Sequence, residues 1–167
     1  MQFLYHKNSG DENIILEKED FNHIFKARRS KKANTLKLRN MQDDILYEYE
    51  LIEKTSKKAS YKLIKQNKQT NQENKLHLAI CIIDIKELEK TLPSLNELEV
   101  AHISFVYSQY SQRNFKINQQ RIEKILINSS QQCGRARLMT TDVFDSVKDY
   151  LEKYPNSYML NFSEKSF

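Results

Sequence analysis

Eleven consecutive residues, 65–75, carry no apolar side chain. A segment of this composition cannot contribute to a hydrophobic core, so the cores of this chain must form on either side of it. With 167 residues, the chain is long enough for two small domains. The sequence therefore predicts one domain at residues 1–64, a linker at residues 65–75 and a second domain at residues 76–167.

The segment before the linker shows the pattern of short β-strands. In residues 45–52, apolar or aromatic side chains occupy every second position from Ile45 to Leu51, as in a strand with one buried face. One helix is expected at residues 18–28, where Phe21, Ile24 and Phe25 recur at helical spacing. A small β-barrel with one helix would close the edges of such a sheet. The other expected strands are residues 3–5, 14–16, 35–38 and 60–64.

After the linker, strands and helices alternate, which favours an open parallel α/β sheet. Pro93 is expected to stop a helix, and Gly134 to cap one in the left-handed conformation. Thr141 is a candidate N-cap for the last helix. The expected strands are residues 76–83, 101–106 and 158–162, and the expected helices are residues 85–92, 95–98, 118–132 and 142–151.

Several kinds of site are excluded by composition. Gly10 and Gly134 are the only glycines, so this sequence contains no glycine-rich cofactor loop. Cys81 and Cys133 lack metal-ligand spacing and are expected to be reduced thiols. No apolar run is long enough to span a bilayer and the first residues do not resemble a signal peptide, so we expect a cytoplasmic protein.

All of the excess positive charge lies in residues 1–72, which carry 15 Lys and Arg against 10 Asp and Glu, whereas residues 73–167 carry 12 of each. The positive field of the basic cluster at residues 26–32 suits a polyanion such as RNA. The alternative is that this cluster is the solvated end of the expected helix, where cations complement the helix dipole. Five of the seven residues at 26–32 are basic, namely Lys26, Arg28, Arg29, Lys31 and Lys32.

The four histidines are too dispersed to form a metal site. His77 and His102 lie in expected strands, where a hydrogen-bonded core or edge histidine is the ordinary interpretation. His23 precedes the basic stretch, so it could contact a phosphate or a base of RNA. A packing role is favoured for His23, because its neighbours Ile24 and Phe25 face the expected core.

The most specific local string is Gln131-Gln132-Cys133-Gly134-Arg135, at the end of an expected helix. It resembles the Glu-Gln-Ser/Cys-Gly-Arg signature of the RsmE family, the ribosomal RNA small-subunit uridine-N3 methyltransferases of the SPOUT class. Residues 23–29 and 97–100 resemble two further family motifs in the same order. Three departures are Gln131 for the usual Glu, Glu99 for a Gly, and Gln109-Tyr110-Ser111 where the family has Glu-Arg-Ser.

The resemblance implies an α/β protein with an all-β N-terminal domain, in which a small PUA-like β-barrel precedes a SPOUT-type parallel sheet. It also implies a homodimer that transfers a methyl group from S-adenosylmethionine to N3 of a uridine in 16S ribosomal RNA of the small subunit. From the sequence itself, neither a metal nor a membrane is expected as a partner. The family's Gly-Pro-Glu-Gly-Gly loop has no counterpart in the 167 residues. We therefore expect a fragment that is inactive and binds S-adenosylmethionine weakly.

The resemblance also suggests site residues. Arg135 is the candidate for a charged catalytic group, with Gln132 and Gly134 at the edge of the active site, and the alternative for Arg135 is an ordinary helix-end arginine. RNA contacts are expected from His23, Lys26, Arg28, Arg29, Lys31 and Lys32. Two other functions remain open at this point, a noncatalytic RNA-binding module and a protein-interaction domain.

Overall fold

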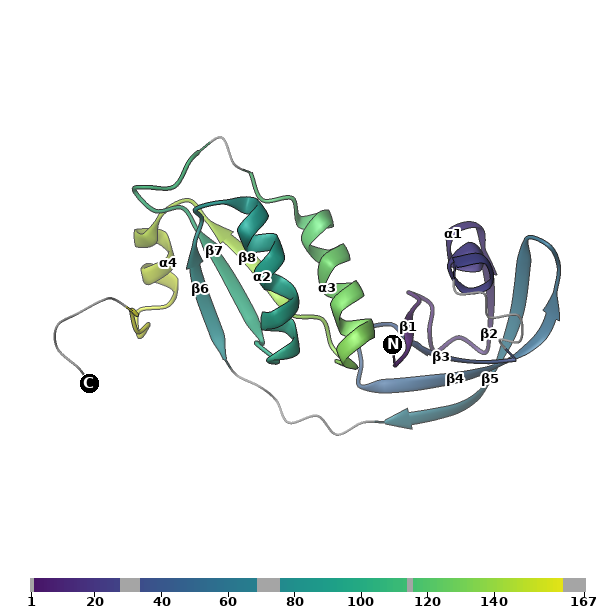
Figure 1. Ribbon diagram of the computed structural model, residues 1–167. Helices are drawn as coiled ribbons and strands as arrows, with labels where there is room; N and C mark the ends of the chain where they lie inside the picture. The colour runs from purple at the N-terminus through teal and green to yellow at the C-terminus, as the bar shows by residue number, and fades with distance from the viewer. Residues whose placement is uncertain (1, 28–33, 69–75, 114–115, 161–167) are drawn as a thin grey trace.

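A computed structural model describes residues 2–27, 34–68, 76–113 and 116–160 (Figure 1). Two sheets follow one another along the chain, a five-stranded curled sheet and then a three-stranded parallel sheet with helices packed on it. This arrangement agrees with the mixed architecture expected from the sequence, an all-β part followed by an α/β part. No helix in the described ranges is long and apolar enough to cross a membrane.

The five strands of the curled sheet lie where the alternating pattern predicts them. Their order is β1-β3-β4-β5-β2, with β1 parallel to β3 and every other pair antiparallel. The register shifts twice between β4 and β5, and such bulges bend a sheet. The strands are β1 (Leu4–Tyr5), β2 (Asn13–Glu17), β3 (Thr35–Arg39), β4 (Ile45–Lys54) and β5 (Lys58–Lys68).

One helical segment packs against the curled sheet. It begins as α1 (Lys18–Asn22) and continues with π-helical geometry as η1 (His23–Ala27), so the expected helix is confirmed up to residue 27. Phe21 and Ile24 are buried in the same cluster as Tyr49 and Tyr61 of the sheet. The first core therefore lies between this helical segment and the concave face of the sheet.

Strand β5 is longer than expected and corrects the start of the linker. It runs to Lys68, four residues into the apolar-free segment, paired with β4 from Ile45 onward. A backbone ladder requires no apolar side chains, and Asn67 adds a hydrogen bond from Nδ2 to Oε1 of Glu48 over 3.0 Å. The rest of the expected linker, residues 69–75, lies outside the described residues.

The second sheet is parallel, as expected, with the order β6-β7-β8. Helices α2 and α3 pack on one face, where Ile103 and Phe105 of β7 meet Leu92, Ile122 and Leu126 in a second buried cluster. Helix α4 contacts β7 and β8 on the other face. The elements are β6 (His77–Cys81), α2 (Ile85–Glu97), β7 (His102–Val106), α3 (Gln119–Cys133), β8 (Thr140–Phe144) and α4 (Val147–Lys153).

The end of the chain differs from the sequence-based expectation. Residues 140–144 form β8, not the start of a helix, and α4 begins only after its N-cap Ser146. Thr141 is therefore a strand residue and not an N-cap. The expected strand at 158–162 is not formed by Tyr158, Met159 and Leu160, which are exposed and outside any strand.

Pro93 does not end the helix in which it lies. Helix α2 continues through Pro93 to Glu97, which unites the two helices expected at residues 85–92 and 95–98. Packing against α3 accounts for the continuation, because Leu92 and Asn96 are buried against that helix and Ser129 of α3 donates to the carbonyl of Pro93 over 3.2 Å. Tertiary contacts thus outweigh the local cost of a proline in a helix.

Candidate functional site

The C-terminus of α3 carries the string on which the family resemblance rests. The helix begins at the N-cap Asn118, whose side chain accepts from the backbone of Arg121, and ends at Gly134. Gly134 has φ of 92°, and its N–H donates to the carbonyl of Ser130 over 2.8 Å. The expected left-handed glycine cap is thereby confirmed.

A side chain at position 134 is expected to destabilise the protein. In Gly134→Ala, the left-handed backbone would be strained, and the added Cβ would overlap the side-chain amide of Gln2. We expect the free energy of unfolding to fall by about 1–2 kcal/mol. Urea denaturation would measure this loss, with exposed Gln132→Ala as the control, for which a change within about 0.5 kcal/mol is expected. Equal stability of both variants would contradict the assigned cap.

The same helix end joins the two parts of the chain. The backbone N–H of Gln2 donates to the carbonyl of Gln131, and the N–H of Tyr5 donates to Oε1 of Gln131, each over 3.0 Å. Nε2 of Gln2 donates to the carbonyl of Cys133. Sequence reasoning noted Gln131 only as a departure from the family motif, whereas in the structure its amide holds the first strand against α3.

Arg135 lies just beyond this helix end and is half-buried. Its Nη1 donates to the carbonyl of Asn96 at the end of α2 over 3.2 Å, and its Nε donates to the carbonyl of Arg137 over 3.0 Å. Burial lowers the pKa of Arg135, while the charge of Glu99 acts in the opposite direction. These contacts fix the turn after α3 to the end of α2, which favours a positioning role.

A second contact between the two parts follows in the same turn. Nε and Nη2 of Arg137 donate to the two carboxylate oxygens of Asp44 over 2.8 and 2.9 Å. This paired geometry orients both groups, although the side chain of Arg137 remains largely exposed and the pair adds little stability. Residues 131–137 therefore form the junction between the curled sheet and the parallel sheet.

The predicted RNA-binding residues are placed only in part. His23 lies in η1 with an exposed side chain, so the expectation that it packs in the core is wrong. It lines a groove that faces α3. Lys26 also belongs to η1, whereas Arg28, Arg29, Lys31 and Lys32 lie outside the described residues.

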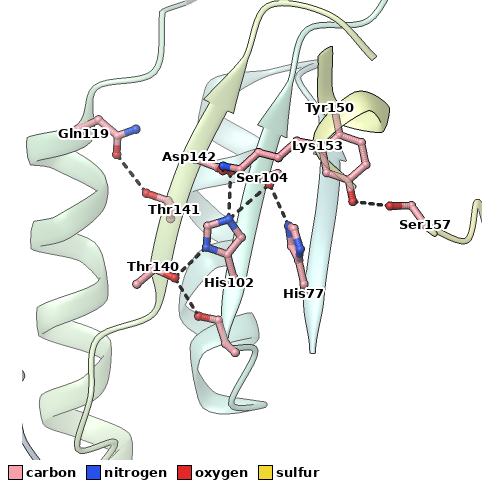
Figure 2. A network of polar contacts seen from close by, with 11 residues as sticks. His77, His102, Ser104, Gln119, Thr140, Thr141, Asp142, Tyr150, Lys153 and Ser157 are labelled. Atoms are coloured by element: carbon pink, nitrogen blue, oxygen red, sulfur yellow. Dashed lines mark hydrogen bonds and ion pairs between the residues drawn. The ribbon is translucent and has the colours of Figure 1, made fainter. Parts of the chain in front are cut away.

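Figure 2 shows a polar network on the face of the parallel sheet that α4 covers. Asp142 of β8 is its centre, because its carboxylate accepts from the hydroxyl of Ser104 and from Nζ of Lys153, the latter over 3.1 Å. Nε2 of His102 lies 3.0 Å from the same carboxylate, and Nε2 of His77 lies 2.8 Å from the hydroxyl of Ser104. The expectation that both histidines are hydrogen-bonded is confirmed.

Serine, histidine and aspartate together could indicate a nucleophilic site, but burial argues against it. Ser104 has no exposed surface, and its hydroxyl donates to Asp142 and not to a histidine. Tyr154 stacks edge-to-face on His77 with ring centroids 4.5 Å apart, and Tyr150 lies nearby at 6.0 Å. The network therefore braces α4 against the sheet.

The carboxyl end of a parallel sheet is where such folds usually bind ligands. Here the loop after β7 is anchored by Ser111, whose hydroxyl donates to the carbonyl of Ile82 and accepts from the N–H of Ser108. Tyr107 is buried, whereas Tyr110 is 90% exposed. Tyr110 belongs to the Gln109-Tyr110-Ser111 string, so this departure from the family motif lies at the surface of the loop.

Comparison with known proteins places this architecture in a family. Residues 70–167 match the family described as RNA methyltransferase domain. The ribosomal RNA small subunit methyltransferase E of Helicobacter pylori strain 26695 is 41% identical over 166 residues, which cover 97% of this chain and 74% of the relative. The corresponding protein of strain J99 is 40% identical over 167 residues, 98% of this chain and 74% of that relative.

Solved structures share the fold at lower identity. A ribosomal RNA small subunit methyltransferase E from Neisseria gonorrhoeae, bound to S-adenosyl methionine, is 18% identical with a TM-score of 0.77, covering 93% of this chain and 66% of that one. A probable rRNA-methyltransferase from Porphyromonas gingivalis is 19% identical with a TM-score of 0.76, covering 90% and 63%. The chain thus spans slightly less than two thirds of these structures. By sequence, it belongs to the ribosomal RNA small subunit methyltransferase E family.

Proposed function

We propose that the protein containing this chain methylates N3 of a uridine in 16S ribosomal RNA, with S-adenosylmethionine as the methyl donor. The observation that carries the proposal is the 41% identity to a ribosomal RNA small subunit methyltransferase E over 97% of the chain. Because the proposed substrate is part of the ribosome, we also propose a cytoplasmic location for the protein, and a homodimer as its active form. We also propose that the curled sheet is a PUA-like barrel that binds RNA.

We also propose that the described residues do not make up an S-adenosylmethionine pocket by themselves. At the carboxyl end of the sheet, the hydroxyls of Ser108 and Ser111 bond to each other, and Ser111 also donates to the carbonyl of Ile82. Tyr107, just before them, is buried in the second core cluster. When bound, S-adenosylmethionine supplies an electrophilic methyl group, and the uridine must lose its N3 proton to accept it.

The residues of this chain would act mainly by positioning. Arg135 fixes the turn after α3 to α2 through two backbone carbonyls, and we propose that this keeps the active-site edge at Gln132 and Gly134 in place. The basic residues at 26–32 would contact RNA phosphates, and His23 would contact a phosphate or a base of the same RNA. Such contacts position a substrate without selecting its sequence, so their loss would weaken binding and flatten its salt dependence.

Deleting the gene tests the proposed function. We expect N3-methyluridine to disappear from digested 16S ribosomal RNA of the deletion strain, as measured by mass spectrometry of nucleosides. Restoring the complete gene on a plasmid should return the modified nucleoside. Unchanged N3-methyluridine in the deletion strain would sink the proposal and would favour a noncatalytic RNA-binding role.

A further inference from the structure

A groove of about 550 Å³ lies between the helical segment of the curled sheet and helix α3. Its residues come from β1, β2, α1, η1 and β3 on one side and from α3 on the other, and Figure 1 shows α1 and α3 on either side of β1. The volume falls within the range of small-molecule sites in proteins. It has the size for one nucleotide, and it is separate from the network of Figure 2 and from the carboxyl end of the parallel sheet.

The floor of the groove is apolar. Leu16, Ile24 and Leu38 line it, and all three are buried in the core of the curled sheet. Tyr5 of β1, His6 just after that strand and His23 of η1 also line the groove. Planar bases bind on such surfaces, because they stack on aromatic or imidazole rings and cover apolar area.

The walls carry groups that suit the edge of a base. Asp20 of α1 and Glu123 of α3 supply carboxylates from opposite sides, and Gln120 and Asn128 supply amides. The charge of Glu123 reaches Tyr5, whose pKa is raised by burial and by that charge. Carboxylates accept hydrogen bonds and amides both donate and accept, which is the set needed to recognise a base with adjacent donors.

The charge of the groove argues against a phosphate as its occupant. Among the described residues, Glu19, Asp20 and Glu123 line it together with one lysine, Lys124. This negative field repels phosphate but leaves a neutral base unaffected. The phosphates are assigned to the basic residues at 26–32, which follow His23 in the sequence.

His6 adds an unused hydrogen-bonding atom. Its Nδ1 is buried and has no hydrogen-bond partner among the described residues. Burial lowers the pKa of His6, although Asp20 and Asp11 oppose this, and the net shift favours the neutral ring. The ring of His6 lines the groove, where a neutral imidazole can stack on a base.

We propose that this groove binds one unpaired base of the RNA substrate, guanine in preference, with a carboxylate accepting from its N1–H and N2–H₂ groups. The inference rests on the proposed function, since it places a second contact to the same RNA away from the methylated uridine. Glu123 is the foremost candidate for that carboxylate, because it lines the groove from α3, opposite the helical segment of the curled sheet.

Titration of the 167-residue chain with nucleoside monophosphates tests the groove. GMP, AMP, CMP and UMP carry the same phosphate, so differences in affinity report on the base alone. We expect GMP to bind at least about tenfold more tightly than UMP, because a hydrogen bond to a charged group contributes enough free energy for a tenfold change in affinity. GMP should also shift the NMR signals of the His6 and His23 rings. Equal affinity for the four nucleotides, or unshifted histidine signals, would overturn the proposal.

Variants assign the preference to the groove. Glu123→Gln should bring the ratio of GMP to UMP affinity close to one, whereas Glu97→Gln, an equal charge change at an exposed position on α2, should leave the ratio unchanged. An unchanged ratio in Glu123→Gln, or the same fall in both variants, would refute the assignment. The methylation assay separates this proposal from the proposed function. If the groove binds the base but no N3-methyluridine is formed, only the proposed enzymatic function is rejected. If N3-methyluridine is formed but the groove binds no base, only the proposed base site is rejected.

Discussion

Phe105→Ala is expected to lower the free energy of unfolding of the parallel-sheet part by about 4 kcal/mol. Phe105 has no exposed surface and lies at the centre of the cluster formed by the sheet with α2 and α3. Truncation removes its ring from contact with Leu92 and Ile122 and leaves a cavity. A small void lined by these residues already adjoins the ring, so the new space would join it. Loss of this core would also displace α3 and the junction at its end.

Urea denaturation followed by circular dichroism would measure the effect. Phe105→Leu should lose about 1 kcal/mol, because most of the volume is kept. Val143→Ala on β8 should lose about 1 kcal/mol or less, because Val143 is 39% exposed. If Phe105→Ala were no less stable than Val143→Ala, the packing of α2 and α3 on this face of the sheet would be refuted.

Much of the fold could be predicted from the sequence because single strands have strong local signals. The alternation in residues 45–52 appears in the structure as buried Tyr47 and Tyr49 separated by less buried neighbours. The α3 boundaries were also local, since Asn118 and Gly134 act through their own backbone positions. Such features depend on the chain within a few residues, which is what a sequence pattern records.

The errors arose where contacts distant in sequence decide the structure. The helix expected at 142–151 had apolar spacing that suits a helix, but pairing with β7 places Thr140–Phe144 in a strand, consistent with the β-branched Thr140, Thr141 and Val143. Pro93 was expected to stop a helix, yet α2 continues past it because it packs on α3. Local propensity is a weak guide when tertiary contacts oppose it.

The residues of the candidate site also fall into two groups, those with a local sequence signal and those brought together by contacts distant in sequence. The helix end at Gly134 was anticipated, but the contacts of Gln131 with Gln2 and Tyr5 join positions more than a hundred residues apart. The network around Asp142 likewise requires the register that sets His102 of β7 beside β8. No spacing within the sequence indicates that these residues come into contact. Only the presence of histidines in strands offered a signal for that network.

Asp142→Asn is expected to lower the free energy of unfolding at pH 7 by about 2 kcal/mol. An amide at this position cannot accept charge-assisted hydrogen bonds from Ser104, His102 and Lys153 in the way the carboxylate does. The side chain of Asp142 is 25% exposed, so solvent weakens but does not remove this contribution. The exposed Asp145→Asn serves as the matched control, with an expected change within about 0.5 kcal/mol.

The pH dependence of stability distinguishes this network from an ordinary surface ion pair. Burial raises the pKa of Asp142, but hydrogen bonds from Ser104, Lys153 and His102 outweigh it and leave the pKa below its ordinary value. Because the pKa is depressed in the folded state, the carboxylate stabilises the fold above its unfolded pKa of about 3.9, and this stability is lost as pH falls through the folded value.

His77 adds a second pH-dependent change in the free energy of unfolding, at higher pH than that of Asp142. Burial, followed by repulsion from His102 and Lys153, lowers the pKa of His77, although Asp142 opposes the shift. A neutral His77 therefore stabilises the fold above its unfolded pKa of about 6.5, and this contribution is lost as pH falls through the folded value. Asp142→Asn removes the opposing charge, so NMR titration should show a still lower pKa for His77 in that variant. An unchanged His77 titration in Asp142→Asn would show that the two groups do not interact, and α4 would then be held to the sheet by its aromatic contacts alone.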